Sequence, residues 1–410
     1  MTVRLASLLL LASALAACKT EVVCTTTQVT CNGQCASLSS DPGNCGACGR
    51  SCGAGESCSA GLCCQGSRCP PAVYAACFNG NAVQGATAAV TPVGAPVPVE
   101  SGPISLTWNG TALWVANSIS NTIDRMKVSP AGLAADGSFP TVKVPGTPFF
   151  DLEFLAEWNG LLYASNAAVG SLVVVDPAAG QPIVAEVDLG AGSYPQGIAF
   201  SGSKAYVALN GSNAVAVVDL LARKVTRTID LSKLANPPGG AMPSRLVASG
   251  SRVYVTLWNL DPTDLKYTPA GNGRLAVIEV STDALAPGVN PVDLGAACQN
   301  PGGLALQGDI LWATCGFFRY DALSSSDITG AAFVPVDLSG AVPVVGTAVP
   351  AVGFAPGAIT FCNGMGYVGD RFSGNVLRFD PSARAVTAQG LVCAPTDTGS
   401  AFVADVICGK

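Results

Sequence analysis

One phrase recurs along this chain and constrains its fold more than any other feature. It consists of an aromatic residue, two small apolar residues, a polar residue that ends the apolar segment, and then Asn or Gly before a run of β-branched residues. Examples are YASNAAVGSLVVVD from Tyr163 and YVALNGSNAVAVVD from Tyr206. A long repeat with β-type patterning throughout is typical of radially arranged four-stranded sheets. The sequence therefore predicts an all-β protein, a β-propeller. The repeated aromatics are Trp114, Tyr163, Tyr206, Tyr254, Trp312 and Tyr367.

The copies predict six complete blades and a seventh that is shared by two distant segments. Each repeated aromatic follows an apolar segment that ends in a small turn, such as ISLTWNG or RLVASG, which we interpret as the inner strand. Residues 73–83 match the second and third strands of a blade but have no inner strand before them, and residues 401–407 have the form of the missing strand. We therefore predict a seven-bladed propeller over residues 71–410, closed by a composite blade that leaves no open sheet edge.

The first residues have the form of an export signal. Arg4 precedes an apolar run that is too short for an ordinary membrane-spanning helix. The sequence LAAC, ending at Cys18, resembles a bacterial lipobox. This resemblance implies that residues 1–17 are a signal peptide, that Cys18 carries a lipid, and that residues 18–23 form a tether. Lys19 follows the cysteine, which in that family implies the outer membrane or cell surface; a plain secretory signal is the alternative.

Residues 24–70 hold ten cysteines. Such density in an exported segment predicts a disulfide framework, because a segment this small cannot build a sufficient core. Zinc is the alternative, since Cys45 and Cys48 have the spacing of metal ligands, but an oxidising compartment favours disulfides. The segment resembles cysteine-rich modules in exported proteins of fruiting soil bacteria.

Alignment of the blades also predicts three disulfides in the propeller. In the fifth blade, Cys298 lies before the inner strand and Cys315 ends the second strand. A second pair of cysteines holds the same two places in the composite blade, and the remaining two pair by elimination. The predicted bonds are Cys298–Cys315, Cys77–Cys393 and Cys362–Cys408.

The motif [YW]-V-x-N followed by N-x-[VI]-x-V-[VI]-D resembles the YVTN family of surface-layer β-propeller repeats, related in form to NHL and senescence-marker-protein propellers. The resemblance covers roughly residues 71–410 and implies the fold much more than a function. Metal-dependent lactonases of the senescence-marker type hold calcium or zinc through Glu, Asn and Asp around the axis.

Counting back from the turn of each inner strand predicts the side chains that line the axis. The positions four residues before the turn are Ser105, Leu155, Gly197, Arg245, Gly303, Ile359 and Asp405. Glu153 shares this side, and Asp151 does so if no bulge intervenes. Oxygen ligands around an axis suit Ca²⁺; the candidates are Asp151, Glu153, Asp405 and Asp370. We favour a structural ion pair or a water-filled channel, because Arg245 can neutralise Asp405.

Two long connections provide a candidate binding face. Residues 259–273 and 316–330 join the second and third strands of neighbouring blades, so they emerge on one face. Aromatic residues together with an Arg are typical of binding hot spots, although the same side chains could simply pack the loops onto the blades. The side chains are Trp258, Leu260, Tyr267, Phe317, Phe318, Arg319 and Tyr320.

Composition narrows the functions that remain. The chain has no histidine, which disfavours serine triads, Cys–His pairs and most zinc or copper sites. Its net charge of -6 offers no basic surface for nucleic acid. We therefore expect a lipid-anchored extracytoplasmic module that binds or displays a protein or glycan, without a cofactor and not an enzyme. The alternatives are a Ca²⁺-dependent lactonase or hydrolase that uses axial carboxylates, and an architectural protein of the envelope.

Overall fold

The computed structural model describes most of the chain, and contacts within it define two compact units, Met1–Cys63 and Cys64–Lys410. Its only described helix is the short 3-10 turn η1 (Ser232–Leu234). No helix within the described ranges is long and apolar enough to cross a membrane. The described residues are 24–25, 28–46, 48–59, 62–64, 71–109, 111–129, 132–146, 151–263, 267–316, 330–395 and 401–409.

The N-terminal unit is held by disulfides around very little regular structure. Its strands are β1 (Val29–Cys31), β2 (Gln34–Ala36), β3 (Ser57–Ser59) and β4 (Leu62–Cys64), where β1 pairs with β2 and β3 with β4. The printed bonds are Cys24–Cys35, Cys31–Cys48, Cys45–Cys58 and Cys52–Cys63. Cys64 is also disulfide-bonded, whereas Cys18 and Cys69 lie outside the described residues.

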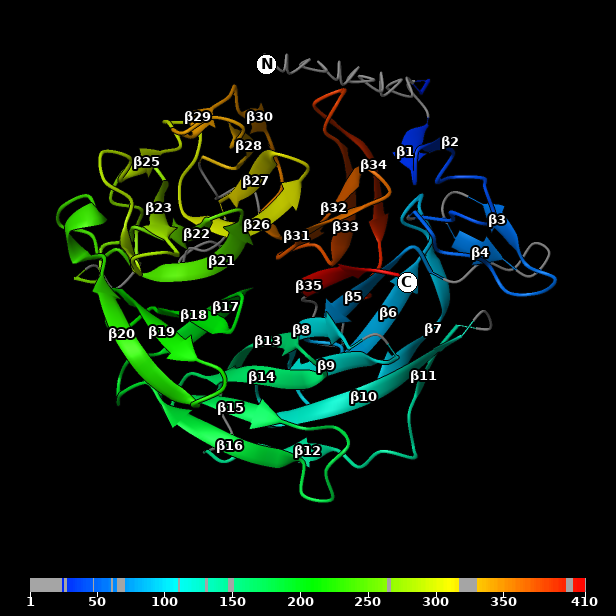
Figure 1. Ribbon diagram of the computed structural model, residues 1–410, viewed down its shortest axis with the longest axis horizontal. Coiled ribbons are helices and arrows are strands. Elements are labelled where there is room, and N and C mark those ends of the chain that lie inside the picture. The colour runs from blue at the N-terminus through cyan, green and yellow to red at the C-terminus, as the bar shows by residue number, and fades with distance from the viewer. Residues whose placement is uncertain are drawn as a thin grey trace, which may run out of the picture. The chain divides into compact units, whose positions relative to one another are not determined.

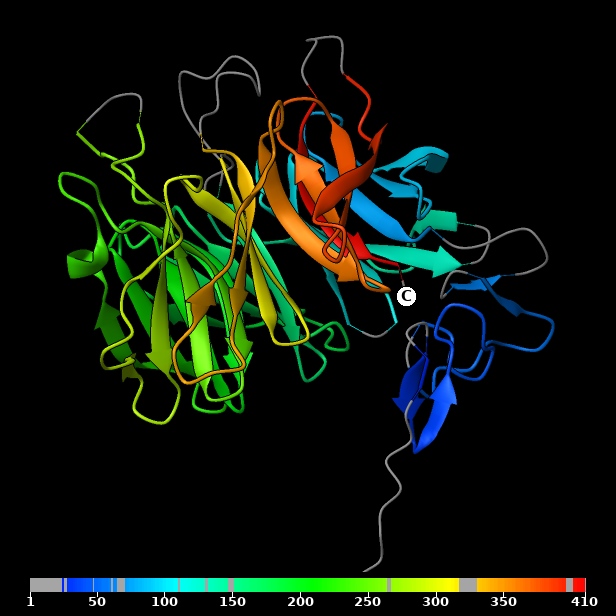
Figure 2. The ribbon, with the colours of Figure 1, turned by 90° about the horizontal axis from the view of Figure 1, so that it is seen from above.

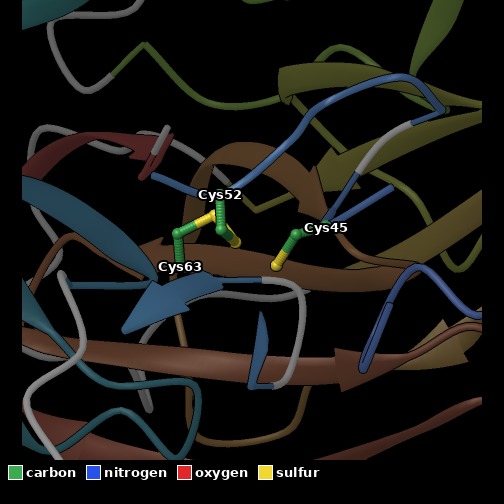
Figure 3. A group of neighbouring side chains, drawn as sticks. All are labelled: Cys45, Cys52 and Cys63. Atoms are coloured by element: carbon green, nitrogen blue, oxygen red, sulfur yellow. A yellow bond between two sulfur atoms is a disulfide. The ribbon is translucent and has the colours of Figure 1, made fainter. Parts of the chain in front are cut away.

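Three sulfur atoms in this unit lie close enough together to suggest a metal centre. Those of Cys45, Cys52 and Cys63 are all within 4.8 Å of one another (Figure 3). Each of them is, however, part of a disulfide and cannot act as a thiolate ligand. The disulfide interpretation of the module therefore accounts for this cluster without zinc.

The second unit is a seven-bladed β-propeller, as the repeat predicts. Seven antiparallel sheets surround a central axis, and the inner strand of each sheet contacts the inner strands of both neighbours (Figure 1). Turned by 90°, the strands of the green and yellow blades run across the thickness of the ring (Figure 2). We number the six continuous blades 1 to 6 in chain order, and the composite blade is blade 7.

The strands are given from the axis outward. Blade 1 contains β8 (Pro103–Trp108), β9 (Leu113–Asn117), β10 (Thr122–Ser129), β11 (Gly132–Ala135) and β12 (Val142–Lys143). Blade 2 contains β13 (Leu152–Trp158), β14 (Leu161–Asn166), β15 (Ser171–Val175) and β16 (Ile183–Asp188). Blade 3 contains β17 (Pro195–Ser201), β18 (Lys204–Leu209), β19 (Ala214–Asp219) and β20 (Lys224–Asp230).

The remaining blades follow the same plan. Blade 4 contains β21 (Pro243–Ser249), β22 (Arg252–Leu257), β23 (Arg274–Glu279), β24 (Ala284–Leu285) and β25 (Val292–Asp293). Blade 5 contains β26 (Pro301–Gln307), β27 (Ile310–Cys315), β28 (Ala332–Asp337), β29 (Val344–Val345) and β30 (Val349–Pro350). Blade 6 contains β31 (Pro356–Cys362), β32 (Met365–Asp370), β33 (Asn375–Asp380) and β34 (Ala385–Leu391).

Blade 7 closes the ring with segments from both ends of the propeller. Its order is β35 (Val403–Cys408), β5 (Val73–Cys77), β6 (Ala82–Ala86) and β7 (Pro92–Pro98). The inner strand β35 pairs antiparallel with β5, so that Val403 lies opposite Cys77. A disulfide joins Cys77 to Cys393 across 316 positions of the chain. The other two bonds are Cys298–Cys315 and Cys362–Cys408, so the structure contains all three pairs expected from the sequence.

The repeated aromatic residues hold neighbouring blades together. Each lies in the second strand of its blade and is almost fully buried. The ring of Tyr163 in blade 2 packs edge-on against Phe200 of blade 3, with 5.3 Å between their centroids. The hydroxyl of Tyr367 in blade 6 donates to the carbonyl of Ala88 in the connection after β6. Large apolar surfaces are thus buried between blades, which explains why this position repeats.

Every inner strand has a β-bulge near its beginning. The pairing register with the second strand shifts between Leu152 and Phe154 in β13 and between Pro243 and Leu246 in β21, and the other five blades show the same shift. We call the face at which the inner strands begin the front face, and the opposite one the back face. A bulge redirects the side chains beside it, so the front end of the axis does not follow simple strand alternation.

Candidate binding site at the propeller axis

Four charged side chains gather at the front end of the axis. Glu153 sits in the bulge of β13, Arg245 in that of β21, and Asp405 is the third residue of β35. Arg371 directly follows β32, a strand that ends at the front face. All four side chains are half-buried. We call this set the axial layer: Glu153, Arg245, Arg371 and Asp405.

Arg245 reaches across the axis. It belongs to blade 4, yet its guanidinium carbon lies 4.7 Å from the ring centroid of Phe154 in blade 2. It interacts electrostatically with Asp405 of blade 7 and with Glu153 of blade 2. Its Nη1 atom is buried and makes no hydrogen bond. Burial lowers the pKa of Arg245, because desolvation disfavours its charged form.

Asp405 is anchored by the backbone. Its carboxylate accepts the N–H of Leu106 at 2.8 Å and that of Val406 at 2.9 Å, and Ser105 also bonds to it. Ser105 in turn accepts the N–H of Leu155 at 3.1 Å. Burial raises the pKa of Asp405, against the lowering effects of Arg245 and these donors. This chain of bonds connects blades 7, 1 and 2 and fixes the carboxylate in place.

Glu153 is held much more loosely. Among the described residues, its carboxyl group has a hydrogen bond with the side chain of Gln196, from blade 3. Burial raises the pKa of Glu153 to about 7, although Arg245 and Arg371 act in the opposite direction. The carboxyl group of Glu153 therefore changes charge near neutral pH.

The two arginines oppose each other. The pKa of Arg371 is lowered to about 9, chiefly by burial and also by the positive charge of Arg245, while the charge of Glu153 acts in the opposite direction. The guanidinium carbon of Arg371 lies 4.3 Å from the ring centroid of Phe402. Both guanidinium groups are thus positioned over aromatic rings, which favours a fixed orientation.

Glu153, Arg245 and Asp405 interact with one another at a distance rather than in contact. Within the described part of the chain, the ion pairs with N–O distances below 4.0 Å include none of Glu153, Arg245 and Asp405. A structural ion pair of the kind predicted for Arg245 and Asp405 would be in contact. Buried charges that do not contact each other are typical of functional sites.

Asp151 lies away from this layer, contrary to the strand-alternation prediction. The bulge between Leu152 and Phe154 intervenes, so Asp151 does not share the side of Glu153. It is fully buried against blade 1, where its Oδ2 accepts from Asn121 Nδ2 at 3.3 Å, while Oδ1 has no partner. Burial raises the pKa of Asp151.

The four predicted calcium ligands do not form one site. Asp370 is fully buried, and it accepts bonds from the N–H groups of Ala355 and Phe372 and from the hydroxyl of Ser373. It therefore caps the turn after β32. Within the described residues, no three carboxylates bring oxygen atoms within 4.8 Å of one another.

The candidate loop face is described only in part. Leu260 is completely buried and bridges Gly240 and Pro269, so it packs the loop rather than facing a partner, which corrects the expectation from its position. Trp258 and Tyr267 are half-buried. The remaining predicted residues, Phe317, Phe318, Arg319 and Tyr320, lie outside the described residues.

A separate pocket of about 340 Å³ lies at the rim, beside β7, β10 and β11. There, Asp136 contacts both Arg125, at 3.3 Å, and Lys127, at 2.7 Å. The guanidinium carbon of Arg125 also lies 5.6 Å from the ring centroids of both Trp114 and Phe139. Because Asp136 forms contact ion pairs with both Arg125 and Lys127, we regard this pocket as structural.

Comparison with known proteins supports the fold of each unit. The model of the stigma-specific STIG1-like protein family matches residues 10–66. No curated protein matches the chain. A protein from Lactobacillus plantarum is similar in structure, with a TM-score of 0.58 and 13% identity over 82% of this chain and 99% of that one.

Two enzymes show comparable similarity. A streptogramin B lyase has a TM-score of 0.54 and 15% identity over 81% of this chain and 94% of its own. Hydrazine synthase of Kuenenia stuttgartiensis has a TM-score of 0.53 and 18% identity over 68% of this chain and 76% of its own. At such low identity the similarity shows the propeller fold and no function.

Sequence reasoning identified Glu153, Arg245 and Asp405 but not Arg371. Arg371 lies beyond the end of a second strand, whereas the axis was sought only on inner strands. The sequence did hold a signal for Arg371. Of the three repeated phrases that begin with Tyr-Val, only the one at Tyr367 continues with an Asp and an Arg, within the segment from Gly369 to Ser373.

Proposed function

We propose that this protein is an exported binding module, held at the cell surface by a lipid on Cys18, whose propeller binds a protein or glycan on its front face. The observation that carries this proposal is the axial layer. Arg245, Glu153 and Asp405 are half-buried and interact electrostatically without forming contact ion pairs among the described residues, so a bound ligand would improve their interactions. The disulfides in both units are typical of an exported protein.

Two further observations are consistent with a front-face partner. The second strands of blades 4 and 5, β22 and β27, end at that face, so the long connections that follow them begin there. The first strand of the propeller, β5, begins at the back face, so the chain enters the ring on the side away from the axial layer. The lactonase alternative gains no support from the geometry, since its proposed carboxylates are separated and two of them are bonded to backbone N–H groups.

Binding can be tested with the full mature protein on a surface plasmon resonance chip. The probes are purified envelope polysaccharides and a detergent extract of outer-membrane proteins. The double variant Val169→Ser with Tyr194→Ser changes exposed side chains at the front face, and Leu221→Ser changes an exposed side chain at the back face. We expect the first to weaken binding at least tenfold and the second to leave it unchanged. Equal binding by both would refute a front-face partner.

The lipid anchor has its own test. The precursor with Cys18→Ser should move from the detergent phase to the aqueous phase in a detergent-partition assay, because the thioether that carries the lipid cannot form. Retention of this variant in the detergent phase would contradict lipidation at Cys18.

A further inference from the structure

The junction between blades 1 and 2 buries an acid that no described base offsets. Asp151 precedes the inner strand β13 at the front face and is fully buried. It belongs to none of the ion pairs within the described part of the chain. Its Oδ1 atom also has no hydrogen-bond partner among the residues that the structure describes. A buried carboxylate oxygen without a donor or a countercharge is costly, which favours a positively charged group beside it.

The other blades show that the fold does not need an acid at this position. The backbone carbonyl of Asp151 accepts the N–H of Ala167, the residue that follows the second strand β14. Five other blades make the same bond, and the side chain of the accepting residue is neutral in every one. These residues are Gly102, Tyr194, Met242, Ala355 and Phe402. The carboxylate of Asp151 is therefore particular to this junction and is not required by the repeat.

A second oxygen atom, on Asn121, lacks the bond that its counterparts make. Asn121 lies in the front-face turn between β9 and β10, and Asn81 and Asn213 hold the same place in blades 7 and 3. The amide oxygens of Asn81 and Asn213 each accept the backbone N–H of the residue before the next inner strand, at 2.9 Å. The corresponding N–H, that of Asp151, bonds instead to the carbonyl of Ser118 at 3.2 Å. Oδ1 of Asn121 is thus buried with no partner within the described ranges.

A third such oxygen belongs to Asn166, at the end of β14 in blade 2. Asn166 is fully buried, and its Oδ1 atom accepts no hydrogen bond from any described residue. Its Nδ2 atom donates to the carbonyl of Pro145 at 2.6 Å. Asn121 Nδ2 donates to the same carbonyl at 3.2 Å and to Asp151 Oδ2 at 3.3 Å. The three side chains with unpartnered oxygens are therefore linked to one another by shared contacts.

Gly146, in the connection between the two blades, keeps the space beside these side chains free. A Cβ atom at this position would lie 2.6 Å from Asp151 Oδ2 and 2.7 Å from Asn121 Nδ2, closer than a carbon atom can approach without displacing them. Its φ angle of 143° is also one that a residue with a side chain rarely adopts. The connection therefore passes the carboxylate without covering it with a side chain.

We propose that the junction of blades 1 and 2 binds one Ca²⁺ ion through Asp151, Asn121 and Asn166. Carboxylate and amide oxygens are ligands that calcium prefers, and carbonyl oxygens and water complete its coordination. One ion satisfies all three unpartnered oxygens and offsets the buried charge, whereas a water molecule leaves the charge in place. Mg²⁺ fits less well, because it requires near-ideal octahedral ligands. A single carboxylate makes the site weak, with a Kd of about 10⁻⁴–10⁻³ M.

This site differs from the calcium site that strand alternation predicts at the axis. Asp151 belongs to both sets, but here its companions are two amides, from the front-face turn of blade 1 and the second strand of blade 2. The site goes beyond the proposed function and does not depend on it, since it requires no protein or glycan partner.

The test is calcium binding by the full mature protein, first treated with EGTA, at neutral pH and constant ionic strength. Equilibrium dialysis against radioactive Ca²⁺ should show about one bound ion per chain at millimolar calcium. Thermal melts in about 10 mM CaCl₂ should lie about 3 °C above those in EGTA, as expected for a ligand present at ten times its Kd or more. MgCl₂ at the same concentration, and NaCl at the same ionic strength, should each give less than half of this shift.

Two substitutions and a matched control make the result specific. Asp151→Asn should lose the bound ion and the calcium shift, and in EGTA, where the charge of Asp151 is not offset, it should melt at or above the wild type. Asn121→Asp should melt lower in EGTA, because a carboxylate replaces the amide that lies 3.3 Å from Asp151 Oδ2. The same variant should bind Ca²⁺ at least tenfold more tightly, since it adds a second charged ligand. Asp136→Asn is the control, because Asp136 is also buried but contacts Arg125 and Lys127, and it should keep the wild-type calcium shift.

The gain in affinity expected for Asn121→Asp separates a calcium site from a merely structural cluster, in which that substitution could only destabilise. The proposal is overturned if the wild type binds no ion at about 10 mM CaCl₂, or if Asp151→Asn keeps the calcium shift. An equal shift with NaCl also overturns it, because the ion would then be monovalent. If Asp151→Asn does not fold, the stoichiometry of the wild type and the affinity of Asn121→Asp still decide the question.

Discussion

Asp136 at the rim of blade 1 and Glu153 at the axis are both acids with two basic neighbours, but burial and contact affect them in opposite ways. Asp136 contacts Lys127 and Arg125 directly, and hydrogen bonds from Lys127 and Ser138 lower its pKa to about 2. Glu153 has its two arginines beyond contact distance, and burial raises its pKa to about 7. The number of basic neighbours is therefore a poor guide to the state of an acid, and the contact distance is a better one.

The difference in contact distance between Asp136 and Glu153 also distinguishes a structural role of charge from a functional one. At the rim, the contact ion pairs of Asp136 stabilise the blade. At the axis, Glu153 and Arg245 form no contact ion pair with another described residue, which costs stability and is common at functional sites. Variants that strengthen or remove one of these arrangements test this distinction.

The largest effect should follow from opening the ring that holds the axis together. The variant Cys77→Ser with Cys393→Ser removes a bond that spans 316 positions, so it should lower the free energy of unfolding by about 4 kcal/mol. Chemical denaturation measures this loss. Hydrogen exchange should increase in β35 and β5, and the rim of blade 4 should be unaffected. Unchanged exchange in β35 would show that closure does not depend on this bond.

Glu153→Gln should stabilise the protein. The folded pKa of Glu153, about 7, exceeds its ordinary value of 4.5, so ionisation costs stability progressively as the pH rises from 4.5 to 7. The variant should gain up to about 3 kcal/mol at pH 8 and nothing at pH 4. Denaturation curves at the two pH values measure the gain. A loss of stability at pH 8 would mean that Glu153 is structurally paired like Asp136.

Asp136→Asn, at the rim, should destabilise the protein, in contrast to Glu153→Gln. The folded pKa of Asp136 is lowered to about 2, so its stabilising effect is complete above its ordinary pKa and disappears as the pH falls through 2. We expect the variant to lose about 2 kcal/mol at pH 7. The difference from the wild type should shrink between pH 4 and pH 2. A pH-independent difference would indicate a packing defect.

Asp151→Asn should have the smallest effect. Burial raises the pKa of this acid, which has no basic partner, so the variant should be more stable than the wild type at pH 8 and equal to it at low pH. The gain should be smaller than that of Glu153→Gln. Thermal melts at both pH values give the comparison, and a lower melting temperature at pH 8 would show that the carboxylate is needed in its charged form.

The fold was predictable because two independent features of the sequence indicate the blades, namely the repeated aromatic residues and the cysteines. Each blade buries the same aromatic position between sheets, so residues such as Tyr206 and Tyr367 mark the second strands wherever they occur. The cysteines mark equivalent places in blades 5 and 7, which is why Cys298–Cys315 indicates Cys77–Cys393. Six complete copies of the repeat then leave one incomplete blade, and its missing inner strand is found at residues 401–407.

The site was less predictable because a bulge is a backbone feature with little signature in the side chains. Alternation along β13 placed Asp151 and Glu153 together, whereas the bulge at Leu152 separates them. The reach of Arg245 across blade 3 to Phe154 depends on side-chain length and on the diameter of the ring. Side-chain length and ring diameter cannot be derived by counting residues along a strand. Arg371 was missed because it follows β32 and does not lie on an inner strand.

The strand that closes the ring also completes the axial layer, because Asp405 lies on β35. During synthesis the chain emerges in order, so β5, β6 and β7 lack their inner strand until residues 403–408 follow them. Until that moment the protein has neither a closed ring nor its anchored axial acid. The ligand recognition proposed above would therefore depend on β35, and a chain clipped before this strand would lack the axial acid Asp405.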